Sequence, residues 1–477
     1  MARRLLIDPV SRIEGHAKVT IELDDDGAVR DARFHVTEFR GFEKLCEGRP
    51  FEEMPGLMAR VCGICPVSHI LASSKAGDRL LGVDVPPTAV AQRRLANYAQ
   101  LLQSHALSFF HLSGPDLLLG FDAEPATRHI LGLAAREPDF ARRGIRLRQF
   151  GQRLIELLGG RRVHPPWSAP GGVNQRFTSA ARDEARAWLP EAYATLELAC
   201  ARLRPLLDGF REEVDHLGDF PSLFLGTVDE DGQLEYYDGN IRIVDGEGNI
   251  VADGLSPQRY ATYLGEAAEA WTFIKNPFYK PMGYPSGMYR VGPLARLNVA
   301  ATAGTPRADR ELRELRHHAG DAAGTVCASF HYHWARLIEM VHAVERIEEL
   351  LDSEVLLGAT IRAKAMLNHQ EGIGVSEAPR GTLFHHYRVD EHGRIVMANL
   401  LIATAQNNLA MNQAVKQTAQ RFVRGHTPAE GMLNRVEHAI RCYDPCLSCS
   451  THALGQMPLV IELRDRQGEL IERLTRD

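Results

Sequence analysis

The chain has 477 residues, enough for two or three domains of average size or for one large domain with a deep core. Hydrophobic residues make up 44% and charged residues 24%, a globular balance that excludes a disordered or fibrous chain. The net charge is -6 and the pI is about 6.4, so nothing in the composition favours a nucleic-acid or anionic-membrane surface, which would need a basic excess.

The first residues include two arginines but lack the apolar stretch of a signal peptide, and no run of about 18 apolar residues occurs further on. We therefore expect a cytoplasmic chain that has no membrane span and no nucleic-acid partner. Eight cysteines are too few for a disulfide scaffold at this length, which favours a reducing compartment.

The first half of the chain starts with strands and continues mainly with helices. Residues 18–36 alternate apolar and polar residues around a DDDG turn, which predicts a β-hairpin. From about residue 52 the period becomes helical, and residues 89–112 form one long amphipathic segment. Further helices are predicted at about 138–158, 180–215 and 329–352, and a small antiparallel sheet with glycine turns at 233–254.

The second half of the chain contains both strand-type and helix-type patterns of apolar residues. Residues 382–403 predict strands, and residues 406–423 and about 430–442 predict helices, the second of which leads into a C-x-x-C motif. The last twenty residues have a hairpin pattern. Since no repeat or linker divides the chain, we expect a single α+β domain over 1–477, predominantly helical, with a central bundle of long helices and peripheral antiparallel sheets.

Two C-x-x-C motifs, RVCGICPVSH and DPCLSCSTH, stand near the two ends of the chain. A C-x-x-C turn places two sulfur atoms within a few ångströms of each other, so it binds soft metals or forms a redox disulfide. The motifs contribute four cysteines and two histidines: Cys62, Cys65, Cys446, Cys449, His69 and His452.

The spacing of the motifs bears on the kind of site. Four-cysteine zinc sites usually space their pairs by about 15–20 residues. Here roughly 380 residues separate the pairs, and neither motif has the βαβ setting of a thioredoxin-like dithiol. From spacing alone, a structural zinc site and a dithiol switch both remain open.

The residues around the motifs identify a family. Together with RIEGH, FRGFE and APRG, the two C-x-x-C segments resemble the signatures of NiFe-hydrogenase large subunits, in the same order and with comparable spacing over nearly the whole chain. The segments FHVTEFRGFEKLCEGRP, EGIGVSEAPRGTLFHHY and CLSCSTHALGQMPL are most similar to the soluble, bidirectional NAD-reducing type. The resemblance implies the NiFe-hydrogenase large-subunit fold and reversible heterolytic cleavage of H2.

The resemblance also implies the metal ligands. Cys62 and Cys446 would be terminal thiolates on nickel, and Cys65 and Cys449 would bridge nickel to an iron that carries CO and cyanide. Soft thiolates suit such a metal pair, and metal binding keeps them deprotonated. Heterolysis of H2 needs a Lewis-acidic metal and a nearby base, and by similarity the Cys446 thiolate is the first base.

Three further residues take catalytic or cyanide-binding roles by similarity. Glu14, in RIEGH, matches the glutamate that relays protons from the terminal cysteine; otherwise it would be a surface carboxylate. Arg380, in APRG, matches the arginine that lies over the metals and faces a cyanide, a task suited to a rigid fork of donors. Thr404, in IATAQN, stands where the family places a hydroxyl donor to the other cyanide, although Ala403 replaces the usual proline.

Two residues are expected to surround the centre without binding it. His69 would donate a hydrogen bond to a bridging thiolate and tune the metals, unless it only caps a helix. Asp444 would face Arg380 or the metal pocket, unless the Asp-Pro pair only forms a turn. Ser104 stands where the family often has an aspartate, a departure from the usual pattern.

A second ion is implied near the C-terminus. Glu43 and His452 match the side-chain ligands of a buried Mg2+ or Ca2+ ion, with the carbonyl near Leu400 and waters as further ligands. Oxygen ligands and water suit Mg2+, whereas a histidine is atypical for so hard an ion. The remaining cysteines have no matched role and are expected to be buried thiols: Cys46, Cys200, Cys327 and Cys442.

No C-x-x-C-x-x-C run, P-loop or G-x-G-x-x-G fingerprint occurs, so we expect no iron–sulfur cluster, flavin or nucleotide in this chain. The resemblance implies partners that carry the electrons away: an iron–sulfur small subunit, then flavin- and iron–sulfur-containing diaphorase subunits that reduce NAD+. It also implies a maturation endopeptidase that removes the C-terminal extension, residues 453–477, after nickel insertion.

Three alternatives stay in view. The chain could belong to an NADP-linked or sulfur-reducing soluble hydrogenase. It could resemble the non-catalytic quinone-site subunit of respiratory NADH dehydrogenase, although that subunit lacks the metal cysteines. It could also be a zinc-stabilised structural subunit.

Overall fold

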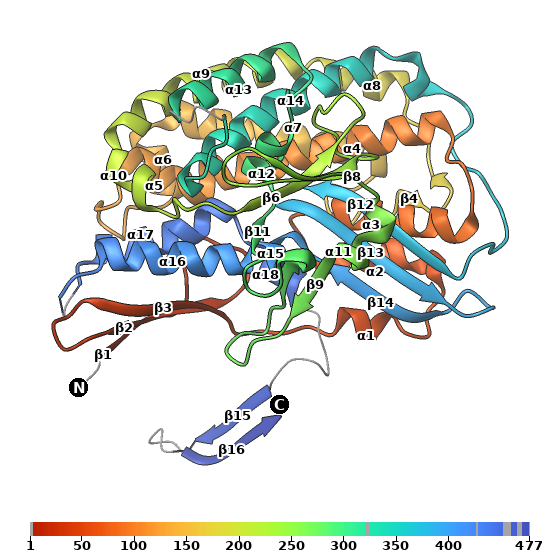
Figure 1. The fold of residues 1–477 in the computed structure, drawn as a ribbon. Coiled ribbons are helices and arrows are strands. Elements are labelled where there is room, and N and C mark those ends of the chain that lie inside the picture. The colour runs from red at the N-terminus through yellow and green to blue at the C-terminus, as the bar shows by residue number, and fades with distance from the viewer. Residues whose placement is uncertain (1–2, 320–323, 426–427, 452–458, 465–469, 477) are drawn as a thin grey trace.

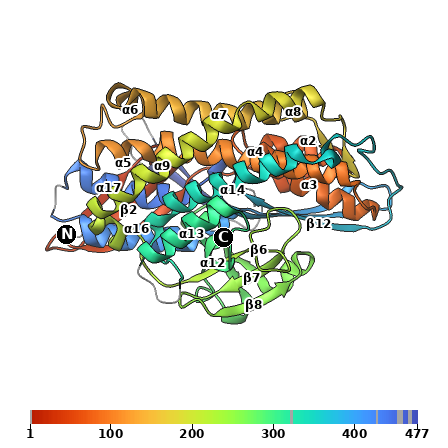
Figure 2. The ribbon, with the colours of Figure 1, turned by 90° about the horizontal axis from the view of Figure 1, so that it is seen from above.

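The computed structural model describes residues 3–319, 324–425, 428–451, 459–464 and 470–476. Its longest helices form a bundle, in which α4 packs against α7 and α14, and α9 packs against α14 and α7 (Figures 1 and 2). The bounds of these helices are Pro87–Ala106 (α4), Pro138–Gly159 (α7), Leu189–Gly209 (α9) and Tyr332–Asp352 (α14). The expected bundle of long helices with small antiparallel sheets around it, an α+β fold, is confirmed.

Glycine allows the closest contact in this bundle. A Cβ atom on Gly151 of α7 would lie 2.6 Å from the carbonyl oxygen of Ala99 on α4, so only glycine lets the two backbones approach this far. The predicted amphipathic segment 89–112 is continuous, but its hydrogen-bond pattern changes: α4 widens into a π-helical turn, η3 (Leu107–Ser113), before α5 (Gly114–Leu119).

The N-terminal sheet extends the predicted hairpin. Strands β2 (Ala17–Leu23) and β3 (Val29–Val36) pair antiparallel around the DDDG turn, and β1 (Arg3–Ile7), which the sequence pattern did not indicate, pairs with the other edge of β2. The side chains of β2 alternate between buried and half-buried, as a strand with one face on the core requires. Figure 1 shows this sheet beneath α16 (Asn408–Phe422).

A second three-stranded sheet, in the order β12-β13-β14, carries several candidate site residues. Its strands span Glu371–Ala378, Gly381–Val389 and Ile395–Leu401. The helix that follows the first C-x-x-C motif, α3 (Pro66–Leu81), packs on β12 and β13. Gly374 makes this contact possible, because a Cβ atom there would lie 1.8 Å from the carbonyl oxygen of Ala72 on α3.

The remaining strands form small sheets. The predicted sheet at 233–254 is confirmed by β7 and β8, to which β6 and β11 add in the order β11-β6-β7-β8, and the C-terminal hairpin pattern is confirmed by β15 and β16. Their bounds, with those of the two short pairs, are Ser168–Ala169 (β4), Gly172–Val173 (β5), Leu223–Val228 (β6), Asn240–Val244 (β7), Ile250–Leu255 (β8), Leu264–Ala267 (β9), Asn276–Tyr279 (β10), Tyr289–Arg290 (β11), Leu459–Arg464 (β15) and Leu470–Arg476 (β16).

The other helices are mostly short. Helices α16 and α17 were predicted from the sequence, whereas α13 was not. The bounds are Phe42–Cys46 (α1), Met54–Met58 (α2), Ile130–Arg136 (α6), Ser179–Arg186 (α8), Arg211–His216 (α10), Tyr260–Tyr263 (α11), Pro293–Val299 (α12), Pro306–His318 (α13), Ala403–Gln406 (α15), Glu430–Tyr443 (α17) and Leu447–Ser450 (α18). Within the described ranges, none of the helices has the length and apolarity that crossing a membrane needs.

Buried Asp116, in α5, joins segments from both ends of the chain. Its carboxylate accepts hydrogen bonds from Arg12 Nη2 at 2.6 Å, from Arg441 Nη1 at 2.6 Å and from His438 Nδ1 at 2.8 Å. Burial alone would raise the pKa of Asp116, but the charge of Arg441 and the hydrogen bond from His438 outweigh it, so this pKa lies well below its ordinary value. The N-terminal loop and α17 are therefore fixed to one buried charge.

We predict that Gly374→Ala lowers the free energy of unfolding by about 2 kcal/mol, because the added Cβ forces α3 away from the sheet. Chemical unfolding followed by circular dichroism measures this change. Gly209→Ala is the matched control: a Cβ at that helical position meets no atom within 4 Å, so no loss is expected. Equal stability of the two variants would contradict the proposed packing role of Gly374.

Candidate metal centre

The first C-x-x-C motif forms the turn between a 3-10 turn, η2 (Ala59–Val61), and α3. Cys62 has an extended backbone, and Cys65 is the residue before the helix, with proline in the first helical position, where its missing N–H costs nothing. The carbonyl of Ile64 accepts hydrogen bonds from Gln100 Nε2 at 2.8 Å and from Gln103 Nε2 at 2.6 Å. Two glutamines of α4 thus fix this irregular turn.

The second motif follows α17, which ends at Tyr443. Asp444 takes a left-handed conformation, with φ of 52°, and turns the chain so that Cys446 precedes the short helix α18. The backbone of Glu14 runs beside Cys446, and the Glu14 carbonyl accepts a hydrogen bond from Leu447 N at 3.2 Å. A Cβ on Gly15 would lie 2.6 Å from the Leu447 Cβ, so the glycine of RIEGH lets the two segments meet.

The four cysteines of the two motifs come together. Their sulfur atoms all lie within 4.8 Å of one another, although the pairs are 384 positions apart in sequence. The Sγ–Sγ distances are 3.2 Å between Cys62 and Cys446, 3.5 Å between Cys65 and Cys449, and 2.8 Å between Cys446 and Cys449. All four are free thiols and at most 4% exposed. Such a compact set of soft donors suits a transition metal.

The protonation of the thiols follows from their burial and mutual contacts. Hydrogen bonds from the neighbouring thiols, that of Cys446 first, hold the pKa of Cys65 well below its ordinary value. Burial raises the pKa of Cys446 and of Cys449 well above it. Burial thus disfavours the thiolate form of Cys446 and Cys449 in the absence of a cation. Metal ions that bind all four sulfurs as thiolates must displace protons and supply positive charge.

A small cavity of about 20 Å³ lies against Cys65, Cys446 and Cys449. Arg380 and Thr404 also line it. The surrounding wall is apolar: Ala378, Pro379, Leu383, Ile402 and Ala403.

The charged wall of this cavity is Arg380, which is 4% exposed. Its Nη2 lies 2.9 Å from Asp444 Oδ2, its Nε donates to the Asp444 carbonyl, and its Nη1 donates to Ser104 Oγ at 3.3 Å. Nη2 makes no well-aligned hydrogen bond to any described residue. A buried guanidinium beside a small cavity fits a small anionic ligand, because Nη2 carries two N–H groups and its ion pair with Asp444 can use one of them. Asp444 and Ser104 both reach Arg380, as expected for a pocket built around it.

Thr404, in α15, contacts the second motif directly. Its hydroxyl oxygen accepts a hydrogen bond from the backbone N–H of Cys446 at 2.9 Å. A hydroxyl has one hydrogen to donate, and this contact leaves that hydrogen available to a group in the cavity. The residue therefore has the right position for a donor, with Ala403 in place of the usual proline.

His69 also lies at the cluster. Its Nε2 is 3.4 Å from Cys449 Sγ, and its Nδ1 is 3.1 Å from His385 Nε2. It stands in the first turn of α3 but is not the residue that caps the helix, which is Cys65. The structure thus places the His69 ring beside Cys449 of the second motif.

The Glu14 side chain is half-buried beside the second motif. Its carboxylate accepts a hydrogen bond from Ser448 N at 3.0 Å and another from the Ser448 hydroxyl. Ser448 lies between the two cysteines of the motif. Glu14 is thus held against the second C-x-x-C motif and is not an isolated surface carboxylate.

The expected second-ion site is only partly within the described residues. Glu43 Oε1 accepts a hydrogen bond from Leu400 N at 2.8 Å, and burial raises the pKa of this carboxyl. Glu43 and Leu400 are therefore neighbours, as predicted. His452, the third expected ligand, lies outside the described residues.

The cysteines without a predicted role are Cys46, Cys200, Cys327 and Cys442, and of these only Cys327 is not fully buried. Cys442 belongs to a cluster that the sequence did not indicate: its Sγ lies 3.6 Å from His333 Nε2, which is 2.9 Å from His438 Nε2. Burial lowers the pKa of His438 to about 4 and raises that of Cys442 to about 12, so both groups are neutral. With Arg441 and Arg12 beside it, we interpret this cluster as hydrogen bonding that packs α17 on α14.

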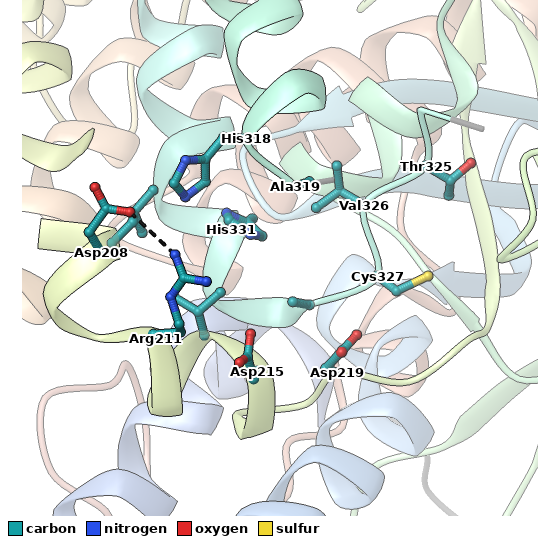
Figure 3. Close-up of a pocket in the computed structure, with 13 residues that line it drawn as sticks. Asp208, Arg211, Asp215, Asp219, His318, Ala319, Thr325, Val326, Cys327 and His331 are labelled. Carbon is teal, nitrogen blue, oxygen red and sulfur yellow. Dashed lines mark ion pairs between the residues drawn. The ribbon is translucent and has the colours of Figure 1, made fainter. Parts of the chain in front are cut away.

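A separate polar pocket lies where α9, α10 and α13 meet (Figure 3). Asp215, Asp219, His318 and His331 line it, and Asp208 pairs with Arg211 at 3.8 Å. It shares no lining residue with the cavity at the cysteines. The four sulfur atoms of the two motifs therefore lie apart from this pocket.

The comparisons with known proteins agree with this site. A family described as nickel-dependent hydrogenase matches residues 40–127 and 213–452, and one described as HoxL-like matches residues 4–39. The chain is 45% identical to the beta subunit of the NAD-reducing hydrogenase HoxS of Cupriavidus necator over 100% of both chains. It is 40% identical to one subunit of the F420-non-reducing hydrogenase of Methanothermobacter thermautotrophicus, over 99% of this chain and 100% of the relative.

The fold is similar to that of a solved NAD+-reducing [NiFe]-hydrogenase in the H2-reduced state. The TM-score is 0.91 at 46% identity, covering 94% of this chain and 99% of that chain. The four-cysteine cluster fits a nickel–iron site. The chain belongs to the nickel-dependent hydrogenase family and is a NiFe-hydrogenase large subunit, as the sequence resemblance implied.

Proposed function

We propose that this chain is the catalytic subunit of a cytoplasmic hydrogenase that couples reversible H2 cleavage to NAD+. The observation that carries the proposal is the convergence of four buried thiols beside a small cavity that Arg380 and Thr404 line. Full-length similarity to one chain of an NAD-reducing hydrogenase supports the choice of acceptor.

The residues present fit a nickel–iron centre with CO and cyanide on the iron. The centre, when bound, would supply a Lewis-acidic site at which H2 is split heterolytically. Cys62 and Cys446 would hold nickel as terminal ligands, and Cys65 and Cys449 would bridge it to iron. The cavity touches both proposed bridging cysteines, which supports placing the iron and its small ligands on that side.

Two side chains would orient the cyanides. Arg380 Nη2 carries a second N–H besides the one that can face Asp444, and the Thr404 hydroxyl has a hydrogen not used by Cys446. Each can donate one hydrogen bond to a nitrogen end of cyanide in the cavity. Asp444, within 2.9 Å of Arg380, balances the charge of the guanidinium and keeps it in place.

The proton would leave through the protein. The Cys446 thiolate accepts it first, and the Glu14 carboxylate, which lies against the loop between Cys446 and Cys449, carries it toward solvent. The contact of the Glu14 carboxylate with Ser448 and the partial exposure of the residue support this direction.

A second ion is part of the proposal. Glu43, the Leu400 carbonyl and His452 would bind Mg2+ or Ca2+ together with water. The contact between Glu43 and Leu400 supports the first two ligands. A divalent cation would also neutralise the Glu43 carboxylate, whose charged form burial disfavours.

The electrons would pass to partner subunits. We propose an iron–sulfur small subunit next to this chain and flavin- and iron–sulfur-containing diaphorase subunits beyond it. NADP+ or a sulfur compound is the alternative acceptor. Assays of the purified complex under H2 with NAD+, NADP+ and polysulfide distinguish these acceptors. Reduction of NAD+ at the highest rate is expected; a complex that reduces only NADP+ or polysulfide would contradict the NAD link.

Residues 453–477 are proposed as a C-terminal extension that an endopeptidase removes after nickel insertion. The position of the β15–β16 hairpin after the last proposed ligand supports this view. We expect the intact mass of this chain from active complex to correspond to a chain that ends near residue 452. A mass that still includes Asp477 in fully active complex would exclude the cleavage.

We predict that Glu14→Gln lowers H2-dependent activity by about 100-fold or more. The amide can keep a hydrogen bond to Ser448, but it cannot accept and release a proton as a carboxylate does. The nickel and iron contents should stay unchanged. Glu38→Gln is the matched control, since Glu38 is 54% exposed and pairs only with His16 among the described ion pairs. Exchange of deuterium gas with solvent protons gives a second measure. Full activity in Glu14→Gln would exclude it from the proton route.

We predict that Thr404→Val lowers the free energy of unfolding by about 1–3 kcal/mol, because it leaves the buried N–H of Cys446 without an acceptor. Thr404→Ser keeps the hydroxyl and should retain most of that stability. If the serine variant lost as much stability as the valine variant, the methyl group and not the hydroxyl would be the important part of Thr404.

A further inference from the structure

The imidazole of His69 is engaged at both ring nitrogens. Nε2 faces Cys449 Sγ at 3.4 Å, and Nδ1 faces His385 Nε2 at 3.1 Å. The ring is 1% exposed, so no solvent molecule competes for these positions. The orientation of the His69 ring toward Cys449 therefore depends on its contact with His385.

The chain of hydrogen bonds continues away from the centre. His385 Nδ1 lies 2.7 Å from the Tyr387 hydroxyl, which donates to Ser73 Oγ at 3.1 Å. His69 and Ser73 are four residues apart on one face of α3, and His385 and Tyr387 are two residues apart on one face of β13. Helix α3 and strand β13 thus hold the four side chains in one hydrogen-bonded row.

The chain is buried over its whole length. His385 is 0% exposed, and Tyr387 and Ser73 are each 1% exposed. Burial raises the pKa of Tyr387 well above its ordinary value, so its hydroxyl stays protonated and keeps both donating and accepting. Gly374 allows α3 to pack closely on the sheet, and this close packing sets the spacing between α3 and β13.

The four side chains are linked in series. Tyr387 donates to Ser73, His385 lies between Tyr387 and His69, and His69 lies between His385 and Cys449, each within hydrogen-bond distance of its neighbours. Loss of the Tyr387 hydroxyl therefore removes a hydrogen-bond partner of His385, the residue that positions His69.

We infer that His385 and Tyr387 are positioning residues for the metal centre, which act by holding His69 in the orientation that contacts Cys449. This inference rests on the proposed function, in which Cys449 bridges nickel and iron. Outer partners of this kind orient the groups around a metal and change its electron density, and their loss typically costs about 10–100-fold in affinity or activity.

The test uses the complete purified complex in four variants. His385→Phe removes both ring nitrogens, and Tyr387→Phe removes only the distant hydroxyl. His385→Gln keeps one acceptor for His69. His386→Phe is the matched control, because His386 points to the other face of β13, where it contacts Glu371 and Tyr260.

Three quantities are measured for each variant: the infrared CO and cyanide bands, the activity per bound nickel, and the nickel retained after dialysis. We expect His385→Phe to shift the CO band and to lower the activity per nickel by about tenfold or more. Tyr387→Phe should shift the band in the same direction by less, and His385→Gln should lie nearer to the unmodified protein. His386→Phe should change none of the three.

Unchanged bands, activity and nickel retention in both His385→Phe and Tyr387→Phe would overturn the inference. If His385→Phe failed to accumulate, Tyr387→Phe would decide, since it removes one oxygen atom from the chain. If the unmodified complex lacked the bands altogether, the proposed CO and cyanide ligands would be wrong. Faster nickel loss from Tyr387→Phe than from His386→Phe would then still support the positioning role, and equal loss would reject it.

Discussion

Four buried sulfur atoms, contributed by segments near the two ends of the chain, must meet within 4.8 Å, and much of the fold follows from this constraint. The entropy of closing so long a loop grows only slowly with its length, so the separation of 384 positions is a modest cost. The larger cost is the removal of charged groups from water. The fold offsets part of it by pairing buried charges near the centre, Arg380 with Asp444 and Asp116 with Arg12 and Arg441, because an unpaired buried ion costs several kcal/mol.

Both C-x-x-C turns are irregular backbone, so side chains from other elements replace the hydrogen bonds that a helix or a sheet would supply. Gln100 and Gln103 bind the Ile64 carbonyl in the first turn, and Thr404 and Glu14 bind N–H groups in the second. The sulfur positions therefore depend on α4, on α15 and on the N-terminal loop at once. This dependence explains why the centre is built into one interlocked structure and why glycines occur at the close contacts, such as Gly15 and Gly374.

The sequence predicted the parts of the site that lie in local motifs. The cysteines, His69 and the neighbours of Arg380 follow from short signatures, and periodicity predicted α7, α14 and α17 because each has a clear apolar face. Strand β12 escaped prediction because seven of its eight residues are buried, which removes the alternation, and α13 because charged residues dominate it. The partnership of His69 with His385, 316 positions away, and the cluster of His333 with His438 depend on tertiary packing, for which no local pattern exists.

The central claim is that all four thiols bind one nickel–iron centre. X-ray absorption at the nickel edge of the purified complex, together with its metal content, tests this most directly. We expect about one nickel per copy of this chain, surrounded by sulfur at thiolate distance and with a scattering contribution from one neighbouring iron, and iron in excess over nickel because the proposed partner subunits hold iron–sulfur clusters. Zinc in place of nickel, or nickel bound mainly by nitrogen and oxygen, would contradict it.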